Sequence, residues 1–96
     1  MSSIYTLAGT SISTTAYATL AASTASPASR LMIVNTTTSI IKIATGASGA
    51  EVDYVAVGPS SSIQFIIGTL LQSGIRLSLK AVDAAPSSGN LVVTLL

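Results

Sequence analysis

Glu51 and Asp53 are the closest pair of carboxylates in this sequence, and their spacing could support catalysis or metal binding. Two residues apart on a strand, both side chains would project to the same face. Such a pair suits glycoside hydrolysis or calcium binding. A hydrolytic pair needs a cleft with sugar-binding aromatics, whereas this chain has one Phe, three Tyr and no Trp. Calcium takes about six to eight oxygen ligands, and only Asp83 remains as a third carboxylate. We therefore favour a solvated loop or strand start, with a metal or subunit contact as the alternative.

Other catalytic arrangements lack their usual residues. The chain has no His and no Cys, which removes the imidazole base, thiolate nucleophiles, disulfides and Cys/His zinc sites. A serine nucleophile would depend on Lys42 or Lys80 as its base. The Gly-Ala-Ser-Gly run at 46–49 lacks the Gly-Lys-Ser/Thr end of a phosphate loop and predicts a turn. We expect no enzymatic activity, no cofactor and no metal.

The surface composition is unusual, because only 7% of the residues are charged while 49% are hydrophobic. Sixteen Ser and twelve Thr occupy many of the places where most proteins carry Lys and Glu. A net charge of +1 without a basic cluster argues against nucleic-acid binding. The longest charge-free apolar stretch, 54–75, is broken by Gly58-Pro59 and other turn residues, so it does not predict a membrane span. The start of the chain lacks the basic region of a signal peptide, and we do not expect secretion by that route.

Short strands are the dominant secondary-structure signal, since Val, Ile and Thr are abundant and turn residues recur every eight to twelve positions. The first two expected strands, 30–35 and 40–44, are predicted to form a hairpin, and residues 68–74 are predicted to turn the chain. The segment 14–20 favours extended structure, with a helix as the alternative. The predicted strands are 30–35, 40–44, 52–57, 63–67, 75–82 and 91–96.

The clearest strand is 75–82, where apolar and polar residues alternate with a period of two. This alternation places Arg76 and Lys80 on the face turned away from the core. Other apolar runs, such as Leu31-Met32-Ile33-Val34, put apolar side chains on both faces of a strand. Because one face of an outer sheet is normally polar in a monomer, two-sided apolar strands predict a further surface that is buried in a homo-oligomer.

These elements predict an all-β protein, a small antiparallel β-sandwich of about seven or eight strands, for which a jelly roll is one possible order. Residues 1–96 form a single domain, in which 1–29 are either an N-terminal arm or extra strands. We expect Tyr5 and Tyr17 to anchor such an arm, with the sandwich core as the alternative place for them. The candidate interface residues are Ile4, Tyr5, Leu7, Ile12, Tyr17, Leu20, Arg76 and Lys80.

Several segments together resemble a family of small virion proteins of tailed bacteriophages. They are the Gly-Ala-Ser-Gly-Ala-Glu-Val-Asp run at 46–53, Gly58-Pro59, the strand at 74–82 and the Ser-Gly-Asn-Leu-Val-Val run at 88–93. The segment 17–23 is similar to the family's early strand. Each element is a short strand or turn, and no catalytic signature is among them.

The resemblance implies a structural protein on the outer capsid surface of the virion, made in the host bacterial cytoplasm. It implies a decoration or cement protein that binds the major capsid protein and often acts as a trimer. A tail or head-fibre component is the nearest alternative. A host-glycan-binding module is a further alternative, in which the loops 36–39, 58–62 and 84–90 would recognise the sugar.

Overall fold

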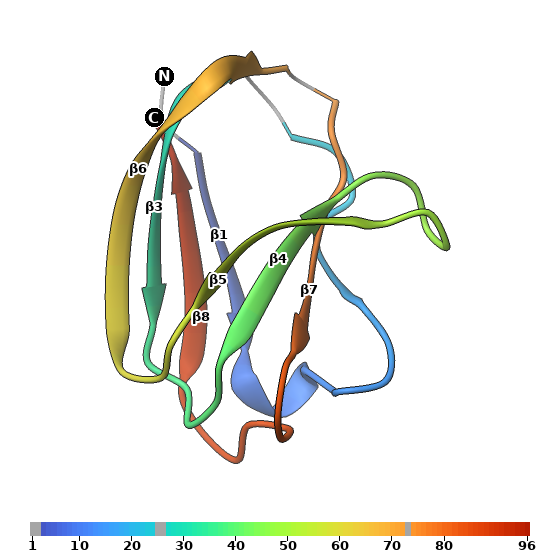
Figure 1. Ribbon diagram of the computed structural model, residues 1–96, viewed down its shortest axis with the longest axis vertical. Helices are drawn as coiled ribbons and strands as arrows, with labels where there is room; N and C mark the ends of the chain where they lie inside the picture. The colour runs from blue at the N-terminus through green and yellow to red at the C-terminus, as the bar shows by residue number, and fades with distance from the viewer. Residues whose placement is uncertain (1–2, 25–26, 73) are drawn as a thin grey trace.

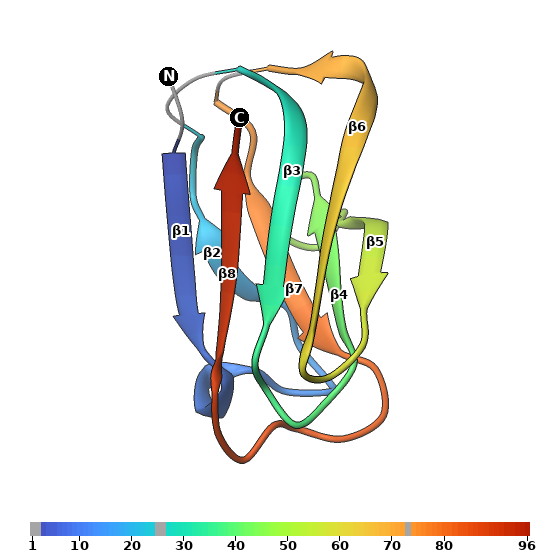
Figure 2. The ribbon, with the colours of Figure 1, turned by 90° about the vertical axis from the view of Figure 1, so that its left-hand side faces the viewer.

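The computed structural model describes residues 3–24, 27–72 and 74–96, which form two four-stranded antiparallel sheets packed face to face. In sheet A the strand order is β1-β8-β3-β6, and in sheet B it is β2-β7-β4-β5. Figure 1 shows the two sheets as two layers, and Figure 2 looks directly at sheet A. The expectation of an all-β sandwich with about seven or eight strands is confirmed.

The eight strands are short, apart from β6. They are β1 (Ser3–Ala8), β2 (Ala18–Ala21), β3 (Ala28–Asn35), β4 (Ile41–Thr45), β5 (Val52–Val57), β6 (Ser61–Leu71), β7 (Leu77–Ala81) and β8 (Asn90–Leu95). A single 3₁₀ turn, η1 (Gly9–Ser11), follows β1 in the described part of the chain. Apart from the β4–β5 hairpin within sheet B, consecutive strands lie in different sheets, and this order is that of a jelly roll, a double-sheet fold made of two Greek keys.

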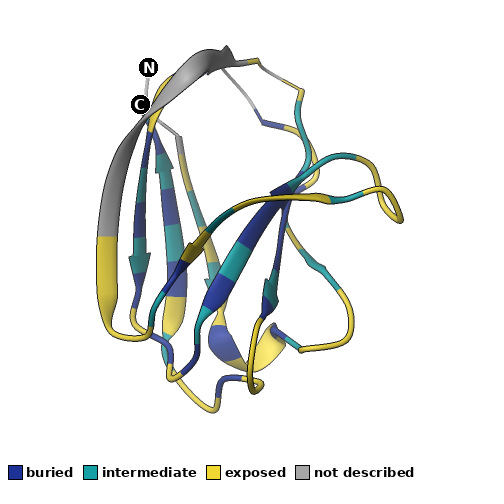
Figure 3. Ribbon diagram, in the orientation of Figure 1, coloured by how far each residue is buried: buried dark blue, intermediate teal, exposed yellow. Residues whose placement is uncertain are grey.

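Alternation along the strands builds the core between the two sheets. On β7 the side chains of Leu77, Leu79 and Ala81 are buried, as the sequence predicted, and Lys80 is on the opposite face. Figure 3 shows the same alternation of buried and less buried residues on the other strands. Fully buried aliphatic side chains from both sheets meet in this core, among them Leu31, Ile33, Ile41, Ile43, Leu91 and Val93.

The predicted hairpin between 30–35 and 40–44 is wrong, although both strands exist. β3 lies in sheet A and β4 in sheet B, so the chain crosses from one sheet to the other between them. Alternation identifies a strand but does not say which neighbour it pairs with, and both strands bury one face in the same core. The turn predicted at 68–74 also begins too early, because β6 continues through Gly68 to Leu71.

Asn35 holds the crossing from β3 to β4 in place. Its side chain is fully buried, and its amide nitrogen lies 2.9 Å from the Ser39 carbonyl oxygen and 3.0 Å from that of Val57. Its carbonyl oxygen accepts hydrogen bonds from the backbone N–H and the hydroxyl of Thr37. This one side chain therefore ties the end of a sheet A strand to the end of β5 in sheet B, as buried polar groups require.

Residues 1–29 contribute strands to the chain's own sandwich in the described structure. β1 pairs with β8 along its whole length at one edge of sheet A, and β2 pairs with β7 at one edge of sheet B. Of the two interpretations of this segment, extra strands match these pairings. Of the segment 14–20, which was predicted to be extended, only the residues from Ala18 onward belong to β2.

Candidate interaction surfaces

The outer face of sheet A is the surface of this sheet that points away from the core. Strand register places Ile4, Thr94 and Met32 side by side in one row across β1, β8 and β3. The next row contains Thr6, Val92, Val34 and Ser62, and it crosses all four strands. Ile4 is 67% exposed, and the side chains at the centre of the rows are half-buried. The described part of this face is therefore a mixture of apolar and hydroxyl side chains.

Charge is nearly absent from sheet A. Among the residues of its four described strands, Arg30 near one end of β3 is the only charged one. In Figure 2 no other described segment lies across the front of this face. Exposed apolar patches commonly mark an interaction site, and here Ile4 is exposed beside the half-buried Met32, Val34 and Val92.

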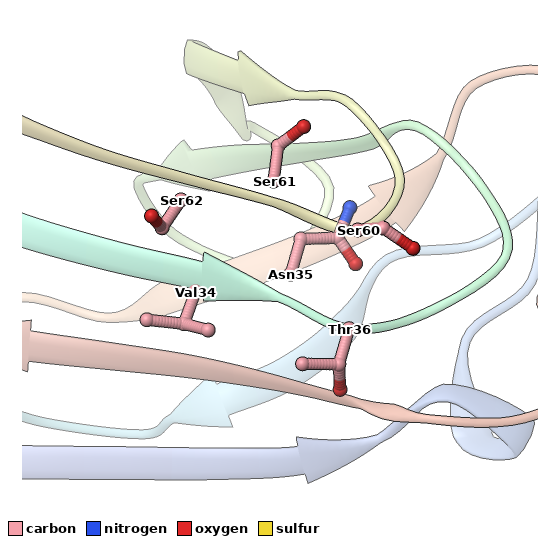
Figure 4. A pocket seen from close by; sticks show the side chains of 6 residues that line it. All are labelled: Val34, Asn35, Thr36, Ser60, Ser61 and Ser62. Atoms are coloured by element: carbon pink, nitrogen blue, oxygen red, sulfur yellow. The ribbon is translucent and has the colours of Figure 1, made fainter.

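A hollow of about 270 Å³ lies at one end of this face, where β3 ends and β6 begins. Figure 4 shows the side chains that line it, which are those of Val34, Asn35, Thr36, Ser60, Ser61 and Ser62. Two of the lining hydroxyls already have partners within the chain. Thr36 Oγ1 donates to the Asn90 carbonyl and accepts from the Asn90 N–H, both at 3.0 Å, and Ser61 Oγ donates to the Pro59 carbonyl at 3.1 Å. The hollow thus joins the second row of the face to a rim of four hydroxyls, of which those of Thr36 and Ser61 are bonded within the chain and those of Ser60 and Ser62 belong to exposed residues.

The outer face of sheet B has the opposite character, because it gathers five of the chain's seven charged residues. Tyr17, just before the edge strand β2, donates from its hydroxyl to Asp53 on the other edge strand, β5, over 2.6 Å. Lys80 Nζ lies 4.5 Å from the centre of the Tyr17 ring, within cation–π range. The Tyr17 side chain therefore lies across the two central strands of the sheet. The five charged residues are Lys42, Glu51, Asp53, Arg76 and Lys80.

Asp53 is the centre of this network. Lys42 Nζ lies 3.0 Å from its second carboxylate oxygen. The hydrogen bonds from Tyr17 and Lys42 hold the pKa of Asp53 below its ordinary value, and they outweigh the opposing effect of desolvation. The same bonds raise the pKa of Tyr17 and of Lys42, because each of these groups keeps its proton while it donates to Asp53. Asp53 also offsets the repulsion between Lys42 and Lys80, which lie directly opposite each other on β4 and β7.

Glu51 forms a second ion pair, 3.2 Å from the Arg76 guanidinium, and Arg76 also donates to the Thr19 hydroxyl at 3.0 Å. Hydrogen bonds from its own backbone N–H, from Arg76 and from the Gly49 N–H lower the pKa of Glu51. Each carboxylate of the predicted pair is thus engaged with a cation of its own. Glu51 directly precedes β5 and Asp53 is its second residue, as a strand start requires, but the Glu51 side chain is only 9% exposed and is therefore not solvated as predicted.

Two small residues lie beneath this network. Ala44 and Ser78 are cross-strand partners on the outer face of sheet B, yet both have an exposed fraction of 0%. We attribute this burial to the long side chains of Tyr17 and Arg76, which extend over the sheet on either side of them. Within the described part of the chain, the Ser78 hydroxyl has no hydrogen-bond partner.

The candidate interface residues separate into three groups. Ile12 is buried in the core, and Tyr5, Leu7 and Leu20 pack against the core, which for Tyr5 is the alternative place that the sequence left open. Ile4 projects from the outer face of sheet A. Tyr17, Arg76 and Lys80 lie together on the outer face of sheet B. The sequence did not identify the rows of sheet A as one surface, because only the strand order brings their residues together. These residues are Ile4, Met32, Val34, Ser62 and Thr94.

Comparison with known proteins gives a shared fold. No protein-family model matches the chain, and no curated protein does. A crystal structure of Fe(II) HppE in complex with substrate matches 99% of this chain with a TM-score of 0.58 and 7% identity. The Co(II) form of HppE with substrate gives a TM-score of 0.51 and 8% identity. The chain spans 46% and 43% of the length of those two chains, and likeness at this identity concerns the fold alone.

The residues described in this chain do not fit a metal centre of the usual donor types. No three His, Cys, Asp or Glu residues cluster among the described positions, and the two carboxylates at the start of β5 are ion-paired on an outer face. No described helix is long and apolar enough to cross a membrane.

Proposed function

We propose that this chain is a structural protein of a tailed-bacteriophage virion, a decoration protein that stabilises the capsid shell by apolar contact and catalyses no reaction. The observation that carries the proposal is the nearly uncharged outer face of sheet A, which crosses all four strands. Burying such a face removes apolar area from water without stripping ions of their hydration. Copies repeated over a shell would add this modest gain many times.

The segments that resemble the phage family support the same proposal from another direction. Residues 46–53 form the loop between β4 and β5 together with the start of β5, and 74–82 contain β7. Residues 88–93 lead into β8, which lies in the middle of the uncharged face. Jelly rolls occur in viral capsid domains, and also in lectins and cupins, so the fold is compatible with the role without selecting it.

Host-glycan binding is the second candidate, because the three loops that it needs converge at one end of the sandwich. Thr36 is bonded to Asn90, and the Ser87 N–H donates to the Thr38 hydroxyl at 3.1 Å. However, these bonds use the polar groups that a sugar would have to contact. We therefore favour apolar contact over sugar recognition.

The direct test is to find the chain in purified particles of the phage that encodes it. Mass spectrometry should detect it at a fixed ratio to the major capsid protein, and a density map should place it on the outside of the shell. A Met32→Glu variant should be excluded from particles, whereas Ala56→Glu, on the outer face of sheet B, should be incorporated normally. Absence of the wild-type chain from the particles would refute the proposal.

A further inference from the structure

The outer face of sheet A carries both a projection and a hollow. Ile4 is the projection, on the edge strand β1 and in the first row of the face. The hollow lies diagonally across the sheet, beside Val34 and Ser62, at the opposite edge and toward the opposite end. The hollow measures about 270 Å³ and is open to solvent, so a side chain of a partner can enter it.

We infer that the outer face of sheet A binds a second copy of this chain, with Ile4 of each copy inserted into the hollow of the other. The inference deepens the proposed function, on which it rests: in solution a second copy covers the face that the shell would contact on the particle, so the two partners compete for it. A two-fold axis in the plane of contact, along the other diagonal of the sheet, exchanges the projection and the hollow. The contact is then isologous and closes at two copies.

The chemistry of the hollow fits an apolar occupant. Val34 provides methyl groups for Ile4 to contact. The hydroxyls of Thr36 and Ser61 are already bonded within the chain, and the buried amide of Asn35 donates to backbone carbonyls. An isoleucine can therefore cover these groups without leaving them unsatisfied, which is the cost that normally opposes burial of polar atoms.

The size and charge of the face also fit a second copy. The molecule extends 32 Å by 19 Å in the view of Figure 2, so two faces stacked over this whole outline would bury at most about 1,200 Å² in total, at the lower end of the range for specific interfaces. The partner must offer a flat face of similar width that brings no unpaired charge. Sheet A of a second copy meets both requirements, whereas sheet B presents its charged network.

Cysteine pairs test this arrangement in the full chain, which contains no cysteine of its own. In one copy, positions 4 and 62 are on opposite edge strands, three strand spacings or about 14 Å apart, too far for a disulfide, which needs Cα atoms within about 7 Å. The double variant Ile4→Cys/Ser62→Cys should therefore form a covalent dimer on mild oxidation. Each single variant should form far less. The matched control is Thr19→Cys/Ala56→Cys, which places the same chemistry on the opposite edges of sheet B and should stay monomeric under denaturing, non-reducing conditions.

Sedimentation equilibrium gives the second measurement. The wild-type chain should be a dimer, and Ile4→Ala should raise the dissociation constant about tenfold or more, as expected when a buried branched side chain is truncated. A monomer, a trimer, or crosslinking no stronger than in the sheet B control would overturn the inference. The particle experiment remains a separate readout: a monomer that is still found on particles refutes only the dimer, and a dimer that is absent from particles refutes only the virion role.

Discussion

The two outer faces of this sandwich differ in the side chains that cover them. Each covers a four-stranded sheet whose inner side is filled by aliphatic residues. On sheet B, Tyr17 and paired charges cover the small residues Ala44 and Ser78 with groups from the same chain. On sheet A, intermediate-sized apolar and hydroxyl side chains remain uncovered in the described structure, and Ile4 projects outward. The difference indicates that the face of sheet B is complete in one copy, whereas the face of sheet A is suited to a partner.

The largest expected effect comes from placing a charge in the middle of sheet A. Val92→Glu should abolish association at micromolar concentrations, because an unpaired carboxylate buried in an apolar contact costs several kcal/mol. The fold should survive, since Val92 lies on the half-buried outer side of β8. Sedimentation velocity measures the association, and circular dichroism checks the fold. Ala56→Glu is the matched change on sheet B, opposite Lys42, and should leave association unchanged. Equal loss of association in both variants would contradict the distinction between the faces.

Acid should affect the two faces differently. Because the fold lowers the pKa of Asp53 from its ordinary value of 3.8, the network stabilises the protein above that value and loses this contribution as the pH falls through the lowered pKa. Glu51 has the same sign. The midpoint temperature of thermal unfolding should therefore decrease when the pH is lowered below about 4. Asp53→Asn should make that decrease smaller. Association should not change between pH 5 and pH 9 at fixed protein concentration, because the outer face of sheet A has no group that titrates in this range. A dissociation midpoint within that range would place titrating groups in the interface.

The buried position of Ser78 on the outer face of sheet B predicts a smaller effect, on the free energy of unfolding. Ser78→Ala removes a buried hydroxyl that lacks a partner in the described chain, so the free energy of unfolding should stay unchanged or rise by about 1 kcal/mol. Ser78→Leu should instead destabilise the fold, because the side chains above position 78 leave no room for a larger residue. Urea unfolding of both variants gives the comparison. A clear loss of stability in Ser78→Ala would mean that the hydroxyl has a hydrogen-bond partner.

The smallest expected effect is that of salt on association. The ion pairs of Lys42 with Asp53 and of Arg76 with Glu51 lie within one chain, so the screening of these pairs by salt does not act on the contact between two copies. Raising sodium chloride to molar concentration should leave the dimer intact or strengthen it slightly. Dissociation by salt would assign the interface to the charged face instead.

Sequence patterns predicted the local features of this molecule and left the long-range ones open. Alternation along β7 placed Leu77 and Leu79 inside and Lys80 outside, because the period of a strand is a property of neighbouring residues. It did not predict that Ser78, on the polar side, would be fully buried. That burial depends on Tyr17 reaching Asp53, 36 residues further along, which follows only from the strand order of sheet B.

The candidate sites show the same division. Glu51 and Asp53 were visible as a pair from their spacing, but each has a different cation as its partner, supplied by β4 or by the segment before β7. Ile4 was recognised as a candidate anchor because it is a large side chain in an uncharged segment. The hollow that we assign to it lies where β3 ends and β6 begins. These two strands are distant in sequence, and they pair beside the connection from β3 to β4 that Asn35 holds in place.

The pairing of β1 with β8 has a consequence for synthesis in the cell. β1 is the first strand to leave the ribosome and β8 the last, yet they are neighbours along their whole length, and β8 also pairs with β3. Sheet A is therefore completed only once β8 has been made, and contacts this distant in sequence are slow to form. The rows that contain Ile4 and Val92 come into existence only after β8 has emerged. A chain from which β8 is still missing thus has no finished surface with which to bind a second copy, and association must wait for this strand.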